Sequence, residues 1–451
     1  MRSSVQLLRC VGAACLLTLL TGAAPAPPPK APVPVPPATA SAADRVDAAV
    51  QGGVAFLLTQ QQPNGAIADV VKYQTALTSL AALALTGAGH SPLDKTPEGV
   101  ALRRAIYFVL RTDRQTADGY FGSADASLMH GHAVTTLLLS ELLRRSTDPE
   151  QEELIRRKAA AAHQFILRSQ GASKTVRGDI GGWRYLPGAR DSDVPVTAWQ
   201  LLALHAGSKA GFPVPPQAGQ AAAQYLKNVY ASAYGVFDYG PKPVFVAPST
   251  AERMWSITNS YRDFTPKVLV QRTPYWDSRL ERRCYTCHYV DGPRQKGRTN
   301  VVDHYVPPMP NQYHPPDSLL QPPGERNHFS TSAMGLLGLR LCGQPTAPEA
   351  ASAAAYLLAT MRADPTARII ANGSWPFHAV FFNTLALQNY AEPHASAARQ
   401  YAEWNFVVGQ SPNGAWTDNY EGRHLGRVYC TSLALLSLEA KYRRLAIYAP
   451  P

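Results

Sequence analysis

The stretch that decides the fold is Gln410-Ser-Pro-Asn-Gly-Ala-Trp416, which has a near copy at Gln115-Thr-Ala-Asp-Gly-Tyr-Phe121. Both place a Gln four residues before a Gly and an aromatic residue two positions after it. Shorter copies are Asn64-Gly-Ala-Ile67 (with Gln61 ahead of it), Ile180-Gly-Gly-Trp183, Tyr234-Gly-Val-Phe237 and Asn372-Gly-Ser-Trp375. A short element that recurs along a chain indicates a repeat architecture.

Each copy lies between two stretches with helical periodicity. The stretches ahead are amphipathic, near 43–60, 96–112, 149–170, 215–230, 347–362 and 394–408. The stretches behind are apolar on nearly all sides, near 70–88, 128–146, 194–209, 328–341, 376–391 and 427–444. Because a helix that is apolar on most faces is buried, each repeat supplies one outer and one inner helix joined by a Gly turn. Six such pairs predict an all-α (α/α)6 toroid, and an open helical solenoid is the alternative.

The Gln-x-x-x-Gly-x-Trp element and the expected helix count resemble the prenyltransferase and squalene-cyclase repeat family, in particular its exported bacterial branch. The segments that carry the resemblance are 181–185, 191–200 and 429–439, and by repeat logic it covers residues 43–240 and 327–448. The resemblance implies a terpenoid-cyclase-like toroid whose inner helices line a central cavity.

One acidic pair is similar to the catalytic acid of those cyclases, which is an Asp-x-Asp-Asp motif. Here Asp191-Ser-Asp193 is followed by Val194, so the last Asp is missing. By position, Asp193 is the candidate proton donor, with Asp191 beside it, and such a donor needs a raised pKa. The alternative is an N-cap, because Asp193 precedes a helix with Pro195 in its first turn.

Aromatic residues are frequent at the expected starts of the inner helices. They are Tyr73, Trp199, Phe329, Phe377, Phe381 and Tyr429. Rings in these positions predict either a surface for an apolar ligand or carbocation, or ordinary core packing.

The spacing of the repeat glycines reveals an insertion. The step from Gly235 to Gly373 is more than twice as long as any other step, and the excess is rich in Pro, Tyr, Arg and Asp. Residues 238–326 therefore form an inserted segment with little regular structure, expected over one end of the ring. It separates toroid residues 43–237 from toroid residues 327–448.

The insertion contains Cys284-Tyr-Thr-Cys287-His288, the attachment pattern of c-type haem. Cys284 and Cys287 would form thioethers to the haem vinyl groups, and His288 would bind the iron from the proximal side. Met309, in Pro307-Pro-Met-Pro310, is the candidate distal ligand, with His304 or His314 as alternatives. A Met ligand raises the reduction potential and a His ligand lowers it.

Zinc is the second interpretation of the same residues. Cys284, Cys287, His304 and His314 have a tolerable spacing for a tetrahedral site. A local disulfide or idle thiols are the remaining alternatives.

The N-terminus predicts export. Arg2 and Arg9 precede an apolar run over 11–20 and small residues at 21–24, which together are typical of a signal peptide spanning residues 1–24. A Pro- and Ala-rich linker at 25–42 follows it, and no later run is long enough to cross a bilayer. These features predict a periplasmic or extracellular protein with no membrane span after signal cleavage.

Composition and charge limit the classes of function. The chain is 45% hydrophobic and 17% charged, which is typical of a globular protein. Its net charge of +11 is scattered rather than clustered, so a nucleic-acid partner is not expected. Three functions remain open: an electron-transfer or redox protein with haem and a partner protein, an isoprenoid-like ligand-binding or cyclase toroid, and a non-catalytic envelope scaffold.

Overall fold

A computed structural model describes residues 42–143, 145, 149–175, 177–232, 234–240, 327–363, 375–418 and 420–450, together with the backbone of 253–254, 267–277 and 282–291. The predicted signal peptide, and the predicted linker up to residue 41, lie outside the described residues. No helix within the described ranges is both long and apolar enough to cross a membrane.

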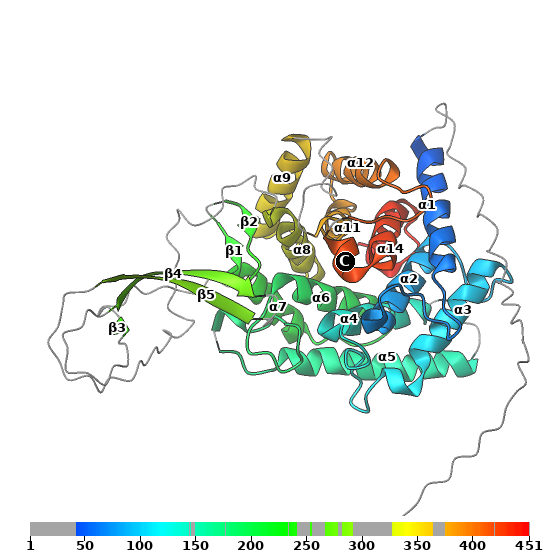
Figure 1. Ribbon diagram of the computed structural model, residues 1–451, viewed down its shortest axis with the longest axis horizontal. Helices are drawn as coiled ribbons and strands as arrows, with labels where there is room; N and C mark the ends of the chain where they lie inside the picture. Colours follow the sequence, from blue (N-terminus) through cyan, green and yellow to red (C-terminus); the bar gives the residue numbers. More distant parts are fainter. Residues whose placement is uncertain are drawn as a thin grey trace, which may run out of the picture.

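Outer and inner helices alternate along the described chain, as the sequence predicts (Figure 1). The outer helices are α1 (Ala42–Thr59), α3 (Pro97–Leu110), α5 (Pro149–Gln170), α7 (Pro216–Asn228), α9 (Pro348–Ala363) and α12 (His394–Val407). The inner helices are α2 (Gln74–Ala88), α4 (Leu128–Leu142), α6 (Val194–Lys209), α8 (Asn327–Leu341), α11 (Pro376–Leu387) and α14 (Arg427–Leu438). The inner set is buried on almost every side; α2, for example, is buried throughout 77–87.

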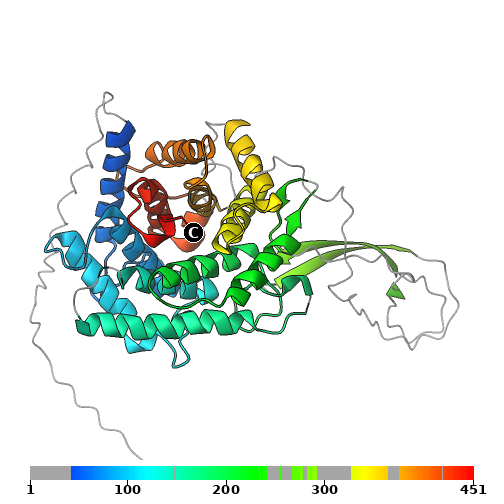
Figure 2. The same cartoon turned by 180° about the vertical axis from the view of Figure 1, so that it is seen from behind.

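The ring is closed. Each inner helix packs on the next one along the chain, and the last, α14, packs on the first, α2. The outer helices α12 and α1 also meet. Seen along the shortest axis of the molecule, and again from behind, the helices encircle a common centre (Figures 1 and 2). The predicted all-α toroid is confirmed, and the open solenoid is excluded.

The repeated Gln and Gly join each turn to the next outer helix. Gln61 Nε2 donates to Ala101 O at 2.7 Å, and Gln115 Nε2 donates to Lys158 O at 2.9 Å. At the seam of the ring, Gln410 Nε2 donates to Ala49 O at 2.8 Å. Gly414 has φ +84°, and a Cβ there would lie 2.1 Å from Gly52 O, so only glycine lets the last turn approach α1.

A second repeated bond fastens each turn to its own inner helix. The backbone N–H two residues after the repeat Gly donates to a side chain one turn into the helix. The pairs are Ile67 to Thr78, Phe121 to His132 Nδ1, Trp183 to Thr197, Phe237 to Ser332 and Trp416 to Thr431, at 3.0–3.2 Å. Trp375 departs from this pattern, because it is 39% exposed and has φ +59° directly before α11.

The starts of the inner helices gather at one end of the ring, which we call the mouth. Among the described residues, the starts of five of the six inner helices, all except α8, are each held by the loop that precedes the next inner helix. The contacts are Asp125 to the N–H groups of Thr75 and Ala76, Tyr185 O to Met129, Tyr239 O to Val194, Glu421 to Phe377 and His378, and Asp69 to Arg427 and Val428. The contact from Asp69 to α14 closes the ring at this end as well.

The described part of the insertion is more regular than the sequence analysis expected. Strand β4 (Lys267–Asp277) pairs antiparallel with β5 (Arg282–Asp291), and β3 (Arg253–Met254) pairs with β4. The β-branched and aromatic residues of both strands favour an extended backbone, and Pro274 within β4 obscures that signal. The hairpin projects outward from the ring and does not cross its centre (Figures 1 and 2), so the expectation that the insertion covers the mouth is wrong for this part.

The two ends of the insertion meet at its base. A short pair of strands, β1 (Tyr230–Ala231) and β2 (Val236–Phe237), leads into it. Asp238 Oδ1 then lies 3.7 Å from His328 Nδ1, and Thr331 Oγ1 donates to Phe237 O at 2.6 Å. The insertion therefore leaves and re-enters the ring at the start of α8.

Candidate functional site

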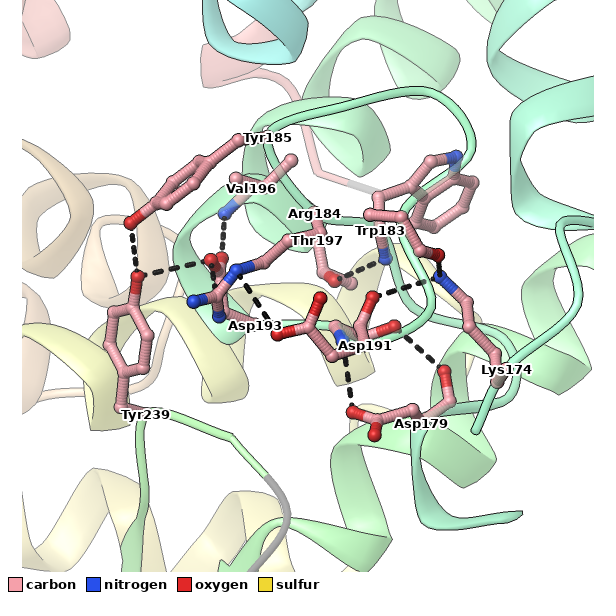
Figure 3. Close-up of polar contacts among 12 residues, drawn as sticks. Lys174, Asp179, Trp183, Arg184, Tyr185, Asp191, Asp193, Val196, Thr197 and Tyr239 are labelled. Carbon is pink, nitrogen blue, oxygen red and sulfur yellow. Dashed lines mark hydrogen bonds and ion pairs between the residues drawn. The ribbon is translucent and has the colours of Figure 1, made fainter. Parts of the chain in front are cut away.

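A buried polar cluster lies between the Gly181 turn, the start of α6 and the first residues of the insertion (Figure 3). At its centre, Asp193 is the N-cap of α6, and its Oδ1 accepts a bond from Val196 N at 2.7 Å. Its own backbone N–H donates to Trp183 O at 2.9 Å. The N-cap alternative for Asp193 is therefore confirmed, with Pro195 in the first turn as expected.

Asp193 is also half of a buried ion pair. Arg184 Nη1 lies 3.0 Å from Asp193 Oδ2, and the two side chains are 2% and 0% exposed. Burial disfavours charged Arg184 and is the largest single effect, but Asp193, Tyr239, Asp191 and Tyr185 together outweigh it and raise the pKa of Arg184 above its ordinary value. Burial raises the pKa of Asp193, with Arg184 and the bond from Val196 acting in the opposite direction.

Asp191 has a different environment from its neighbour. It lies 3.6 Å from Arg184 Nε, and its side chain is 40% exposed. The loop around it is fixed through the backbone: Lys174 Nζ donates to Asp191 O at 3.0 Å, and Ser192 N donates to Asp179 Oδ1 at 2.9 Å. The structure thus brings both predicted carboxylates onto one arginine, but only Asp193 is buried.

Two tyrosines complete the cluster, and sequence reasoning missed both. Tyr239 OH donates to Asp193 Oδ2 at 3.0 Å, and the hydroxyls of Tyr239 and Tyr185 are 2.5 Å apart. The Arg184 guanidinium lies 4.7 Å from the Tyr185 ring centroid and 5.4 Å from that of Tyr239. Burial and the nearby Asp193 carboxylate raise the pKa of Tyr239 well above its ordinary value, so this hydroxyl keeps its proton and acts as a donor.

Chemically, the cluster is built to hold structure in place. The Asp193 carboxylate accepts hydrogen bonds from Val196 and Tyr239 and forms an ion pair with Arg184, and these three contacts favour its ionised form. Tyr239 immediately precedes the part of the insertion outside the described residues, and its backbone O also accepts a bond from Val194 N at 2.9 Å. The cluster therefore anchors the insertion to the start of α6.

The predicted aromatic residues divide into two groups. Trp199, Phe329, Phe377 and Phe381 are buried, whereas Tyr73 and Tyr429 at the mouth are half-buried. Trp199 reaches from α6 to α11, where its Nε1 donates to His378 Nε2 at 2.8 Å. Its ring lies 5.5 Å from Phe381, so these side chains fill space between two non-adjacent inner helices.

A further buried acid at the mouth was also missed. Glu421, on the short helix α13 (Glu421–Leu425), accepts bonds from Phe377 N at 2.6 Å and His378 N at 3.2 Å. Burial raises its pKa to about 8, and those two backbone donors act in the opposite direction. No periodic signal marks this residue, because its contact with α11 is formed by a loop more than forty positions away.

The residues predicted for haem or zinc lie in the insertion. Cys284, Cys287 and His288 all lie on β5, where the backbone pairs them with Tyr275, Arg272 and Gln271 of β4. Met309, His304 and His314 lie outside the described residues. In the portion of the chain that the structure describes, no group of three or more His, Cys, Asp or Glu side chains has a metal-binding arrangement.

The similarity of this chain to known proteins concerns the fold alone. No protein-family model matches the chain, and no curated protein matches it in sequence. A similar solved structure is the type II terpene cyclase MstE from Scytonema, at 14% identity, covering 89% of this chain and 100% of that one with a TM-score of 0.44. Another is the GH76A α-1,6-mannanase from Salegentibacter sp. HEL1_6, at 8% identity, covering 88% and 99% with a TM-score of 0.45. Both are α/α toroids.

Proposed function

We propose that this chain is an exported α/α toroid that carries a c-type haem on its insertion and serves in electron transfer or redox sensing. The observation that carries the proposal is the spacing of Cys284-x-x-Cys287-His288, in a hairpin that projects from the ring (Figure 1). Residues three apart in a regular strand lie on opposite faces, so attachment of one haem requires residues 284–287 to leave the extended conformation. Two thiols and an adjacent imidazole at this spacing suit covalent haem attachment. A projecting hairpin also suits contact with a redox partner protein.

When bound, the haem would supply a one-electron iron couple. The chain would supply two thioethers from Cys284 and Cys287, a proximal ligand from His288 and a distal ligand from Met309, His304 or His314. The toroid would supply a rigid base, because Tyr239 is held through both its hydroxyl and its backbone O.

The test is an absorbance spectrum of the full chain expressed with cytochrome-maturation machinery, paired with metal analysis. We expect a Soret band and a positive pyridine haemochrome in the wild type, and their loss in Cys284→Ser/Cys287→Ser. Cys342→Ser is the matched control, because Cys342 is a free cysteine of α8's end and outside the motif. Stoichiometric zinc without a Soret band would favour the zinc site over the haem. A protein with no zinc and no Soret band would overturn both interpretations.

A toroid that binds or cyclises an isoprenoid-like apolar molecule is the second candidate. Half-buried Tyr73 and Tyr429 at the mouth support it, as rings able to contact such a ligand. Asp193 would be its acid, although the ion pair with Arg184 favours the carboxylate over the proton-donating form.

A further inference from the structure

The C-terminal segment lies in the middle of the ring, at the end opposite the mouth, which we call the floor. Both views place the C-terminus at the centre of the encircling helices (Figures 1 and 2). Leu445, Ala446, Ile447 and Tyr448 are at most 4% exposed.

Residues 444–448 contact inner helices around most of the ring. The bonds are Arg444 Nη1 to Gly87 O at 3.3 Å, Ala446 N to Glu141 Oε1 at 2.6 Å, Asn389 Nδ2 to Tyr448 O at 3.1 Å and Tyr448 OH to Leu436 O at 2.6 Å. These partners belong to α2, α4, the end of α11 and α14, and α6 packs on the same segment. The segment therefore closes the floor as a plug.

Glu439 lies directly after α14, five residues before Arg444. Its side chain is 0% exposed, and neither carboxyl oxygen has a hydrogen-bond partner within the described chain. A Cβ on Gly87 would lie 2.1 Å from Glu439 Oε2, so α2 has glycine where the carboxyl group needs room. An ionised carboxylate without a hydrogen bond costs far more free energy to bury than a neutral carboxyl group does.

Other titratable groups lie around the floor as well. Burial raises its pKa well above the ordinary value, and Arg444 acts in the opposite direction. Tyr442 and Tyr448 have pKa values raised by burial and remain neutral hydroxyls. From α6, His205 has its pKa lowered to about 4 by burial, so it is neutral as well. The remaining charged neighbours are Glu141 and Arg145 on the α4 side and the Lys441–Asp47 pair.

We propose that residues 443–450 are a proton-controlled plug: the seated segment, with Leu445 beside the Glu439 carboxyl group, buries that group in its neutral form, and ionisation of Glu439 releases the segment. The plugged form binds the proton more tightly than the released form, where the pKa returns towards 4.5. The plug is therefore most stable below that value, and its stability falls as the pH rises towards the plugged-state pKa. One proton changes the ratio of plugged to released chains by at most tenfold per pH unit.

The test is hydrogen exchange of the full chain followed by mass spectrometry between pH 5.5 and 8.5. After correction for intrinsic rates, we expect the protection of 443–450 to fall with rising pH in the wild type. Glu439→Gln should keep the segment protected and remove the pH dependence. Glu153→Gln is the matched control, because Glu153 is exposed on α5 and should behave as the wild type.

The protection of α4 separates plug release from global unfolding and should stay constant over the same range. Protection of 443–450 that does not change with pH in the wild type would overturn the proposal, even if Glu439→Gln failed to fold. A Glu439→Gln variant that retains the wild-type pH dependence would overturn it too.

Discussion

Asp193 is held by donors from three directions, and this geometry predicts how the residue responds to substitution. In Asp193→Asn, the new side chain can still cap α6, but buried Arg184 loses the nearer and buried one of its two carboxylate partners and keeps only the more exposed Asp191 at 3.6 Å. Removing one partner of a buried ion pair costs about 3–5 kcal/mol, so we expect a loss of that size in the free energy of unfolding by urea. Asp191→Asn is the matched control and should change it by less than about 1 kcal/mol, because Asp191 is 40% exposed.

The same substitution separates the cluster's structural role from a catalytic one. An Asp193→Asn protein as stable as the wild type would contradict the ion-pair argument. Loss of isoprenoid turnover with full stability would favour the cyclase candidate.

The N-cap was predictable from Pro195 alone, because capping depends on adjacent residues. Tyr239 was not predictable, because nothing local relates it to a carboxylate 46 positions earlier.

At the scale of elements, the turn glutamine is the residue that joins neighbouring repeats. Gln410 donates to Ala49 O and to Gly414 O at 2.8 and 2.9 Å, across the seam between the last and first repeats. Gln410→Ala removes both bonds, and we expect a loss of about 1–3 kcal/mol in the free energy of unfolding. Hydrogen exchange should rise first in α1 and α12, which meet at this seam.

Gln224→Ala is the control for that prediction, because Gln224 is an exposed glutamine on α7 that bonds only Asn228 in its own helix. Equal effects of the two substitutions would contradict the role of the seam. The helices themselves were predictable because the inner set is buried on nearly all sides. A helix buried in this way has apolar residues on nearly all its faces, and the sequence shows that pattern directly. The β4–β5 hairpin was not, because Pro274 and many charged residues interrupt its alternation.

For the whole molecule, the described contacts join the insertion to the closed ring at the base of the insertion. The ring closes through α14 and α2, and the insertion departs and returns at one place, where Asp238 lies 3.7 Å from His328. Ring closure was predictable from six repeats, but the direction of the hairpin was not, because spacing locates an insertion in sequence without orienting it.

We therefore predict that the ring folds without the insertion. Replacing residues 241–326 by a Gly/Ser linker of about six residues keeps Tyr239, Asp238 and His328, and spans their short separation. The melting temperature should stay within about 3 °C of the wild type, since each kcal/mol shifts it by roughly 2–4 °C in a chain of this size. The far-ultraviolet helical signal should persist while any Soret band disappears. An unfolded deletion variant would show instead that the insertion supplies part of the ring's stability, and a retained Soret band would place the haem outside Cys284 and Cys287.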